Sequence, residues 1–233
     1  MREAVTPGPR AEPGQGPREH EHVHDRAHAA LIGPDPVPRT RVDTLLAAVP
    51  ARDPETSRPE SLARAERQRR RWATQVVVAD ELARRECAAR GLKVPPEAAP
   101  ERLLAVSGSE VADLGSIVAA ALAHSAAARV LLDALEGEQA VPEADVRDYY
   151  ERNRDRFLTP DALRRGADPF EAAAPGDVMP YQDVREGVLR ELRRAAGRRA
   201  FFGWLDLARG PVVYAQGHEH PGDPAHPDHE HRH

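Results

Sequence analysis

The sequence predicts an all-α fold, a bundle of helices with a histidine-rich tail at each end. Aromatic residues make up only 4% of the 233 residues, so Ala, Leu and Val must fill the core. Long stretches rich in Ala, Arg and Glu favour helix. Within these stretches apolar residues recur at three-and-four spacing, the pattern of a helix that buries one face.

The expected helices begin and end at residues with known capping roles. Gly91 stands where a C-terminal cap belongs, and Ser107 stands three residues before Glu110 in a capping-box pattern. Pro142 suits the first position of a helix, because no partner is needed there for its missing N–H. Short apolar runs near both ends predict strands. In chain order we expect a strand at 29–32, helices at 41–49, 59–91, 108–135, 142–157 and 181–209, and a strand at 212–214.

The chain divides into one helical domain, residues 27–216, and two tails. Residues 1–26 are rich in Pro, Gly and charge, and they carry too little apolar surface to be expected to stay ordered. Residues 217–233 form the histidine-rich C-terminal tail. Inside the domain, residues 158–179 contain three prolines and two glycines, so we expect an irregular loop there.

Histidine is concentrated at the two ends of the chain. Of the 11 histidines, only His124 lies elsewhere. Imidazoles mixed with carboxylates suit Zn, Ni, Co or Cu(II), which makes both ends candidate metal binders. A solvated, low-complexity tail that binds metals weakly and makes no use of them is the alternative interpretation. The candidate metal ligands are His20, His22, His24, His28, His218, His220, His226, His229, His231 and His233.

The two expected strands bring these histidines into relation. We expect 29–32 to pair antiparallel with 212–214, as the first and last strands of the domain. In an antiparallel pair the start of one strand neighbours the end of the other. Both histidine segments would then leave the domain at one corner, where together they could supply four ligands in a closed, structural-type sphere.

Composition and charge argue against several classes of partner. A net charge of −5 gives no general reason to expect nucleic acid or an anionic membrane surface. No run of about 18 apolar residues is present, so no membrane span is expected. The first residues lack the apolar core of a secretory signal, and Cys87 is the single cysteine, which excludes an internal disulfide. We therefore expect a cytoplasmic protein without nucleic-acid or membrane partners.

Catalytic motifs give no support to an enzyme. The sequence contains no Gly-rich phosphate loop, no Gly-x-Ser-x-Gly and no Cys-x-x-Cys. We interpret His124 as a partly buried side chain and Cys87 as a buried thiol. Arginine clusters at 67–71 and 193–199 are interpreted as solvated helix faces, since few aromatic residues accompany them. We expect no catalytic residue.

Residues 141–157 resemble the helix that precedes the parvulin domain in SurA-like peptidyl-prolyl isomerase chaperones. The stretch ends in the Tyr-x-x-Asn-x-x-x-Phe pattern of that helix, closed here by Phe157. Residues 86–92, with a Glu-x-x-x-x-Gly-Leu pattern, and 181–207 are similar to neighbouring helices of the family. The Glu-His-Pro-Gly-Asp-Pro run at 219–224 resembles the tail of high-GC bacterial proteins often labelled peptidyl-prolyl isomerases.

The resemblance implies both a fold and a missing part. In the family, the parvulin domain with its catalytic residues lies between the helix ending here at Phe157 and the helix returning at Tyr181. Residues 158–180 are too few for such a domain, and no histidine lies among them. The resemblance therefore implies the helical peptide-binding part alone, with no catalytic residue to carry over.

Three functions stay open at this point. The first is a chaperone-like module that shelters apolar client segments in a groove between helices and carries a metal-binding tail. The second is a metallochaperone or metal-storage protein that docks on an apo-metalloprotein. The third is peptidyl-prolyl cis-trans isomerase activity, for which the catalytic domain is missing. The expected partner is thus a client polypeptide or an apo-metalloprotein, and exposed apolar stripes leave a homodimer open.

Overall fold

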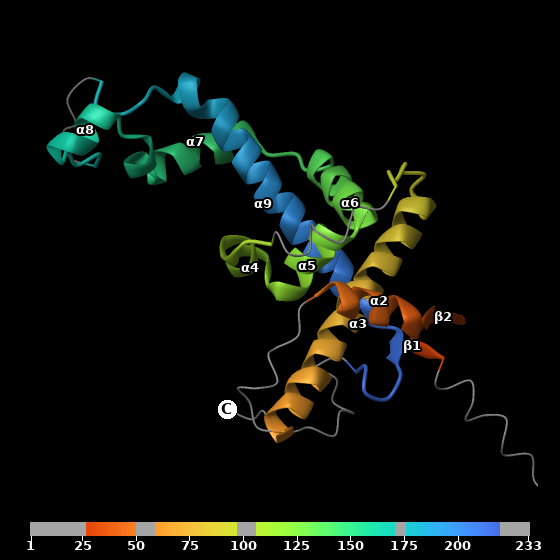
Figure 1. The fold of residues 1–233 in the computed structure, drawn as a ribbon. Coiled ribbons are helices and arrows are strands. Elements are labelled where there is room, and N and C mark those ends of the chain that lie inside the picture. The colour runs from red at the N-terminus through yellow and green to blue at the C-terminus, as the bar shows by residue number, and fades with distance from the viewer. Residues whose placement is uncertain (1–26, 50–58, 97–105, 171–175, 220–233) are drawn as a thin grey trace, which may run out of the picture.

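The structure, a computed structural model, is mostly helical with a small three-stranded antiparallel sheet (Figure 1). It describes residues 27–49, 59–96, 106–170 and 176–219. The helical character of the prediction is confirmed, and the sheet has one strand more than expected. The elements are β1 (His28–Ile32), β2 (Asp35–Pro38), α2 (Arg39–Ala48), α3 (Pro59–Ala89), α4 (Gly108–Leu114), α5 (Ser116–His124), α6 (Ala126–Gly137), α7 (Glu143–Arg152), the 3-10 helix η3 (Arg154–Phe157), α8 (Pro160–Arg165), α9 (Tyr181–Arg209) and β3 (Val212–Tyr214).

The sheet joins the first and last described segments of the chain. β1 pairs antiparallel with β3, with Ala30 opposite Tyr214 and Ile32 opposite Val212, which confirms the expected pairing. β1 also pairs with β2 through a tight turn at Gly33, whose φ of 63° lies in the left-handed region that favours glycine. The sequence does not predict β2, because its two prolines are typical of turns. The order β2-β1-β3 makes β2 an edge strand, where proline is tolerated.

Helix α3 forms the centre of the core. Its segment 73–80 is buried at every position, so this part of the helix is enclosed on all sides. β1, α2, α5, α6 and α9 all contact it. Three of the enclosed side chains are polar, namely Thr74, Gln75 and Asp80, and buried polar groups require hydrogen-bond partners from neighbouring elements.

The single helix expected at 108–135 is wrong. The structure has three helices there, α4, α5 and α6, which break at Gly115 and Ser125. Gly115 takes φ 76° and ψ 153°, outside the helical region, and the Ser125 hydroxyl accepts the N–H of Ala128 at 2.9 Å as the N-cap of α6. α5 and α6 consequently meet at 106°. Apolar periodicity alone does not reveal such breaks.

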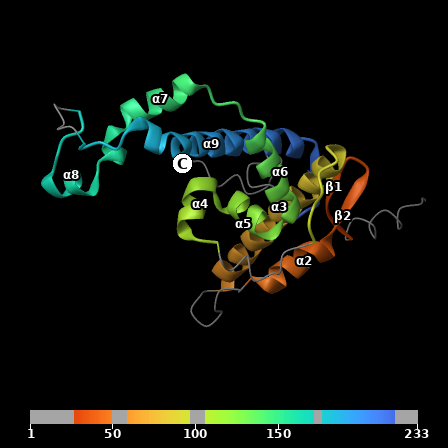
Figure 2. The same cartoon turned by 90° about the horizontal axis from the view of Figure 1, so that it is seen from above.

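The molecule has two parts, which we call the body and the arm. The arm consists of residues 141–170 and 176–192, and the body is the rest of the described chain. Figures 1 and 2 both show the arm extending away from the body, with α9 connecting the two. The body buries one large core around α3, whereas the arm buries Val146, Tyr181 and Val188 in a separate small cluster.

Helix α9 uses different faces for the two parts. Its bounds agree with the predicted 181–209. Val188 is buried in the arm cluster, and Phe201 and Leu205 are buried in the body core. At 3.6 residues per turn, the step from Val188 to Phe201 turns the helix surface by about 140°. Phe201 therefore lies on nearly the opposite face of α9 from Val188. The face that packs against the body core is thus the face that, in the arm, points away from α7.

The helix expected at 142–157 is shorter than predicted. α7 ends at Arg152, and Asn153 leaves the helical region with φ −120° and ψ 40°. The Asn153 side-chain amide donates to the carbonyl of Tyr149 at 2.7 Å, and the backbone N–H of Asn153 donates to the same carbonyl at 3.1 Å, so both groups cap the helix end. The chain then continues as the 3-10 helix η3.

Residues 158–179, expected to be an irregular loop, contain the short helix α8. The Thr159 hydroxyl caps its start, and Gly166 ends it with a φ of 69°. Leu158 and Val178 form an isolated β-bridge that closes the loop. Within the described part of this interval, that bridge is the only extended pairing.

No single helix in the described ranges is long and apolar enough to cross a membrane. α5 and α6 reach the required length and apolar content only as a pair, and the bend of 106° lies between them.

Candidate functional site

His218 is buried beside α3, shortly after β3 ends. Only 2% of its surface is exposed. Its Nδ1 lies 2.8 Å from the hydroxyl oxygen of Thr74, which is itself buried in α3. A hydrogen bond from the backbone N–H of His218 to the carbonyl of Ala215 forms the turn that brings the ring inward. The chain thus stays packed on the body beyond residue 216, where the sequence places the start of the C-terminal tail.

Charged groups surround this imidazole. Burial lowers the pKa of His218 below its ordinary value, and the neighbouring Arg39 and Arg70 lower it further. Glu219 and Asp43 act in the opposite direction without reversing the shift. The neutral imidazole is therefore the form that this position favours.

His28 lies at the same corner of the body. It is the first residue of β1, and the carbonyl of the next residue, Ala29, accepts the N–H of Ala215 at 3.0 Å. The described ends of both histidine segments therefore leave the body together, as the strand pairing predicts. Among the residues that the structure describes, no three His, Cys, Asp or Glu side chains gather into a metal-binding group. The remaining candidate ligands lie outside the described residues, namely His20, His22, His24, His220, His226, His229, His231 and His233.

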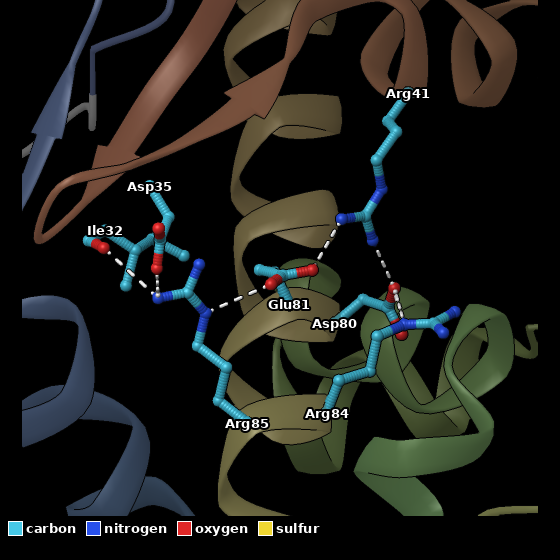
Figure 3. A network of polar contacts seen from close by, with 7 residues as sticks. All are labelled: Ile32, Asp35, Arg41, Asp80, Glu81, Arg84 and Arg85. Carbon is cyan, nitrogen blue, oxygen red and sulfur yellow. Dashed lines mark hydrogen bonds and ion pairs between the residues drawn. The ribbon is translucent and has the colours of Figure 1, made fainter. Parts of the chain in front are cut away.

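A network of ion pairs fastens α2 to α3 (Figure 3). Asp80 lies at its centre, where its Oδ2 accepts from Arg41 Nη2 at 2.6 Å and from Arg84 Nε at 2.8 Å. The Asp80 side chain is only 2% exposed, and Oδ1 has no hydrogen-bond partner within the described ranges. Two guanidinium groups thus compensate the charge of one buried carboxylate.

Glu81 extends the network to the β1–β2 hairpin. It accepts from Arg41 Nη1 at 2.7 Å and from Arg85 Nε at 3.0 Å. Arg85 also donates to the carbonyl of Ile32 at 3.1 Å and to the carboxylate of Asp35 at 3.0 Å. Burial raises the pKa of the Glu81 carboxyl, but the two guanidinium groups outweigh burial and leave this pKa below its ordinary value. The network holds the hairpin, α2 and α3 together, which is a structural role.

A cavity of about 340 Å³ lies between α4, α5 and α6. Its two polar side chains already have partners. Glu110 accepts the backbone N–H of Ser107 at 2.8 Å in the predicted capping box, which is confirmed. Arg129 donates to the carbonyls of Leu122 and Ala123 at the end of α5. The rest of the lining is apolar and consists of Val106, Leu114, Ala119, Leu122 and Ala123.

The outer end of the arm exposes large apolar side chains. Leu163 on α8 is 60% exposed and Phe170 is 59% exposed. Met179, which follows the β-bridge, is also exposed. Figure 1 shows α8 at the end of the arm that is farthest from the body. These side chains are available to an apolar partner.

Cys87 is the buried thiol that the sequence analysis expects. It lies in α3, and its Sγ is 3.4 Å from the carbonyl oxygen of Ala127. Burial raises the pKa of the thiol, which favours the unreactive protonated form. His124, the last residue of α5, is partly buried.

The chain matches no family model, no curated protein and no solved structure.

Sequence reasoning missed the buried His218, the ion network and the cavity. One signal for the network is present in the sequence, because Asp80 and Glu81 interrupt the apolar run from Val76 to Ala83 in the most buried part of a helix. No local pattern marks the cavity, which forms only when three helices that break at Gly115 and Ser125 fold against one another.

Proposed function

We propose that this chain is a non-catalytic, chaperone-like module that binds client polypeptides, with a histidine-rich tail that binds a transition metal ion. The cavity between α4, α5 and α6 is the observation that carries the proposal. Because Glu110 and Arg129 already have hydrogen-bond partners, an incoming group gains free energy there mainly by burying apolar surface. A volume of about 340 Å³ lies within the range of ligand pockets and suits a few apolar side chains.

The arm supports the same function. Its outer end presents Leu163 and Phe170 to solvent, away from the body core. A non-native client exposes apolar segments that such side chains can cover. Binding of this kind removes apolar surface from water and requires no covalent step.

We also propose that the chain corresponds to the helical part of a SurA-like chaperone that lacks the parvulin domain. The pairing of β1 with β3, the first and last strands of the body, supports this. The long helix α9, which begins at Tyr181, supports it as well. The interval 158–180 offers α8 and one isolated bridge among its described residues, where the family has a whole domain. A cytoplasmic location belongs to the same proposal and rests on the single, buried Cys87.

Metal handling is the second candidate function, in which the tails store Zn, Ni, Co or Cu(II) or deliver it to an apo-metalloprotein. The observation that favours it is the common corner, where His28 begins β1 and His218 follows the adjacent strand β3. Since His218 is buried and Thr74 already engages its Nδ1, we assign the metal ligands to His28 and to the histidines outside the described residues. His218 then fixes the start of the C-terminal segment to the body.

Suppression of protein aggregation tests client binding. A chain that ends at Glu219 keeps the buried His218, and we expect it to suppress light scattering by a thermally unfolding protein as well as the full chain does. Ala123→Asp places a charge in the cavity and is expected to abolish suppression while the helical circular dichroism persists. Full suppression by the Ala123→Asp variant would contradict the proposal, and catalysis in a proline-isomerisation assay would contradict its non-catalytic part.

Calorimetric titration with Zn²⁺ or Ni²⁺ tests the metal function. If the two tails act jointly, a chain that begins at residue 27 binds the ion more weakly than the loss of His20, His22 and His24 accounts for. An unchanged affinity per remaining histidine would show that the two segments act separately, and no binding by the full chain would exclude the function.

A further inference from the structure

We infer that the client segments bound at the α4–α6 cavity carry acidic residues beside their apolar side chains, because a row of arginines on α9 borders that cavity. The inference rests on the proposed client-binding function and specifies its partner.

The arginine row consists of Arg190, Arg194 and Arg198. Their four-residue spacing places them on one face of α9. Arg198 Nη1 lies 3.8 Å from Oδ2 of Asp113 on α4, and Asp113 directly precedes Leu114 of the cavity lining. Both Figure 1 and Figure 2 place α4 beside the middle of α9. The row therefore begins next to the cavity and runs along α9 into the arm.

Two charges of this row are available to a ligand. Arg190 and Arg194 are exposed, and neither has an acidic partner within the described ranges. The acidic residues of α9 nearest to them are engaged elsewhere, since Glu186 pairs with Arg185 and Glu191 pairs with an arginine of the arm. The positive charges of Arg190 and Arg194 are thus not compensated by acidic residues of α9 itself.

Glu110 adds a negative charge to the cavity wall, one turn of α4 before Asp113. Hydrogen bonds from the backbone N–H and hydroxyl of Ser107 lower the pKa of the Glu110 carboxyl, which keeps it ionised at neutral pH. A client carboxylate is therefore repelled near Glu110 and attracted along α9 to Arg194 and Arg190. This distribution of charge orients the client segment as well as selecting its charge.

The spacing along α9 sets the spacing in the client. Four helical residues separate Arg194 from Arg198, a rise of about 6 Å. An extended peptide covers that distance with about two residues. We expect the preferred client to have an apolar side chain in the cavity and carboxylates about two to four residues away, on one side.

Arg199 provides a matched control on the same helix. It is exposed like Arg194 and carries the same charge. Five residues of helix turn it by about 140° away from Arg194, off the face that carries the row. An effect of net charge alone would appear at both positions, whereas a local effect would appear only in the row.

Fluorescence anisotropy with the full chain tests the inference. The probes are three labelled peptides with one shared apolar sequence and two flanking Glu, two Gln or two Lys residues. At low salt we expect the Glu peptide to bind at least about tenfold more tightly than the Lys peptide, with a smaller difference at about 0.5 M salt. The double variant Arg190→Glu, Arg194→Glu is expected to reverse this preference, and the single variant Arg194→Glu is expected to weaken it. Arg199→Glu, which changes the net charge as much as Arg194→Glu does, is expected to keep the preference, with unchanged circular dichroism in all three variants.

The outcomes distinguish a failure of the charge selection from a failure of client binding. Equal binding of the three peptides, or the same change from Arg199→Glu as from Arg194→Glu, overturns the charge selection and leaves client binding standing. Binding of none of the three peptides overturns both.

Discussion

The body and the arm are held together by different forces. The body encloses α3 with apolar side chains from the sheet and four helices, and each fully buried apolar side chain contributes roughly 1.5–3 kcal/mol. The arm buries only a small cluster, and its ion pairs, Glu143 with Arg185 and Glu191 with Arg156, remain largely exposed. Exposed pairs of this kind contribute little to stability, because solvent screens them. We therefore expect the arm to open locally while the body stays folded.

Aromatic contacts add to the small core of the arm. The ring of Tyr150 lies 5.2 Å from that of Phe157 and 5.4 Å from that of Tyr181, between ring centroids. The Tyr181 hydroxyl donates to Glu143 at 2.6 Å, and the guanidinium of Arg147 lies 4.5 Å from the centre of the Tyr181 ring. Tyr181 is thus the side chain on which the polar and apolar contacts of the arm converge.

The largest effect is expected from a deletion in the body core. Phe201 is 1% exposed, and Phe201→Ala is expected to lower the free energy of unfolding of the whole body by about 3–5 kcal/mol. Leu207, on the same helix but 82% exposed, serves as the control, with an expected change below about 0.5 kcal/mol for Leu207→Ala. Urea unfolding followed by circular dichroism measures both. Equal losses would contradict the assignment of α9's second half to the core.

A smaller effect is expected from the ion network of the body. Asp80→Asn keeps the side-chain shape but removes the buried negative charge that Arg41 and Arg84 both contact. Breaking a fully buried pair costs about 3–5 kcal/mol; because these arginines are 31% and 38% exposed, we expect about 1–3 kcal/mol by urea unfolding. Asp161→Asn, in an exposed pair with Arg164, is the control and is expected to change little. A neutral Asp80→Asn would show that the network does not fasten α2 to α3.

A deletion in the arm is expected to act locally. Val188→Ala removes buried methyl groups and should destabilise the arm by about 1–2 kcal/mol. Hydrogen exchange is the measurement, with faster exchange expected in α7 and in the first half of α9 and unchanged exchange in α3. Faster exchange throughout the chain would contradict the independence of the two parts.

The smallest effect is expected from acid. Hydrogen bonds from Arg185 and Tyr181 lower the pKa of Glu143 to about 2. Since the folded-state pKa lies below the unfolded value, this contribution to arm stability is present above the ordinary Glu pKa of 4.5 and is lost as pH falls toward about 2. As pH falls over this range, we expect the protection of α7 amides, measured relative to their intrinsic exchange rate at each pH, to decrease in the natural chain. The decrease is expected to be smaller in Glu143→Gln and to persist in the exposed control Glu151→Gln. An NMR titration that places the Glu143 pKa near 4.5 would refute this account of the pair.

The elements with local signals could be predicted from the sequence. The bounds of α9 follow from a proline before its first residue and Gly210-Pro211 after its last, and the capping box of Ser107 with Glu110 marks the start of α4. The pairing of β1 with β3 follows from two apolar runs at opposite ends of one domain.

The features that depend on contacts between distant residues could not be predicted. The break at Ser125 lies in a continuous apolar pattern, and its hydroxyl becomes a cap only because α6 turns away at that point. The sequence places His218 in a polar tail, and only the structure shows that it packs beside Thr74. The cavity and the arginine row lie on segments far apart in the sequence, and the Arg198–Asp113 contact relates them.

The central claim is that apolar client segments bind where α4, α5 and α6 meet. NMR shift mapping of the full chain with the Glu-flanked peptide tests it most directly. We predict that amide shifts concentrate at Leu114, Ala119 and Ala123 and continue along α9 to Arg194 and Arg190. Shifts confined to the histidine segments or to the β3 edge, or no shifts at a peptide concentration that saturates anisotropy, would contradict the claim.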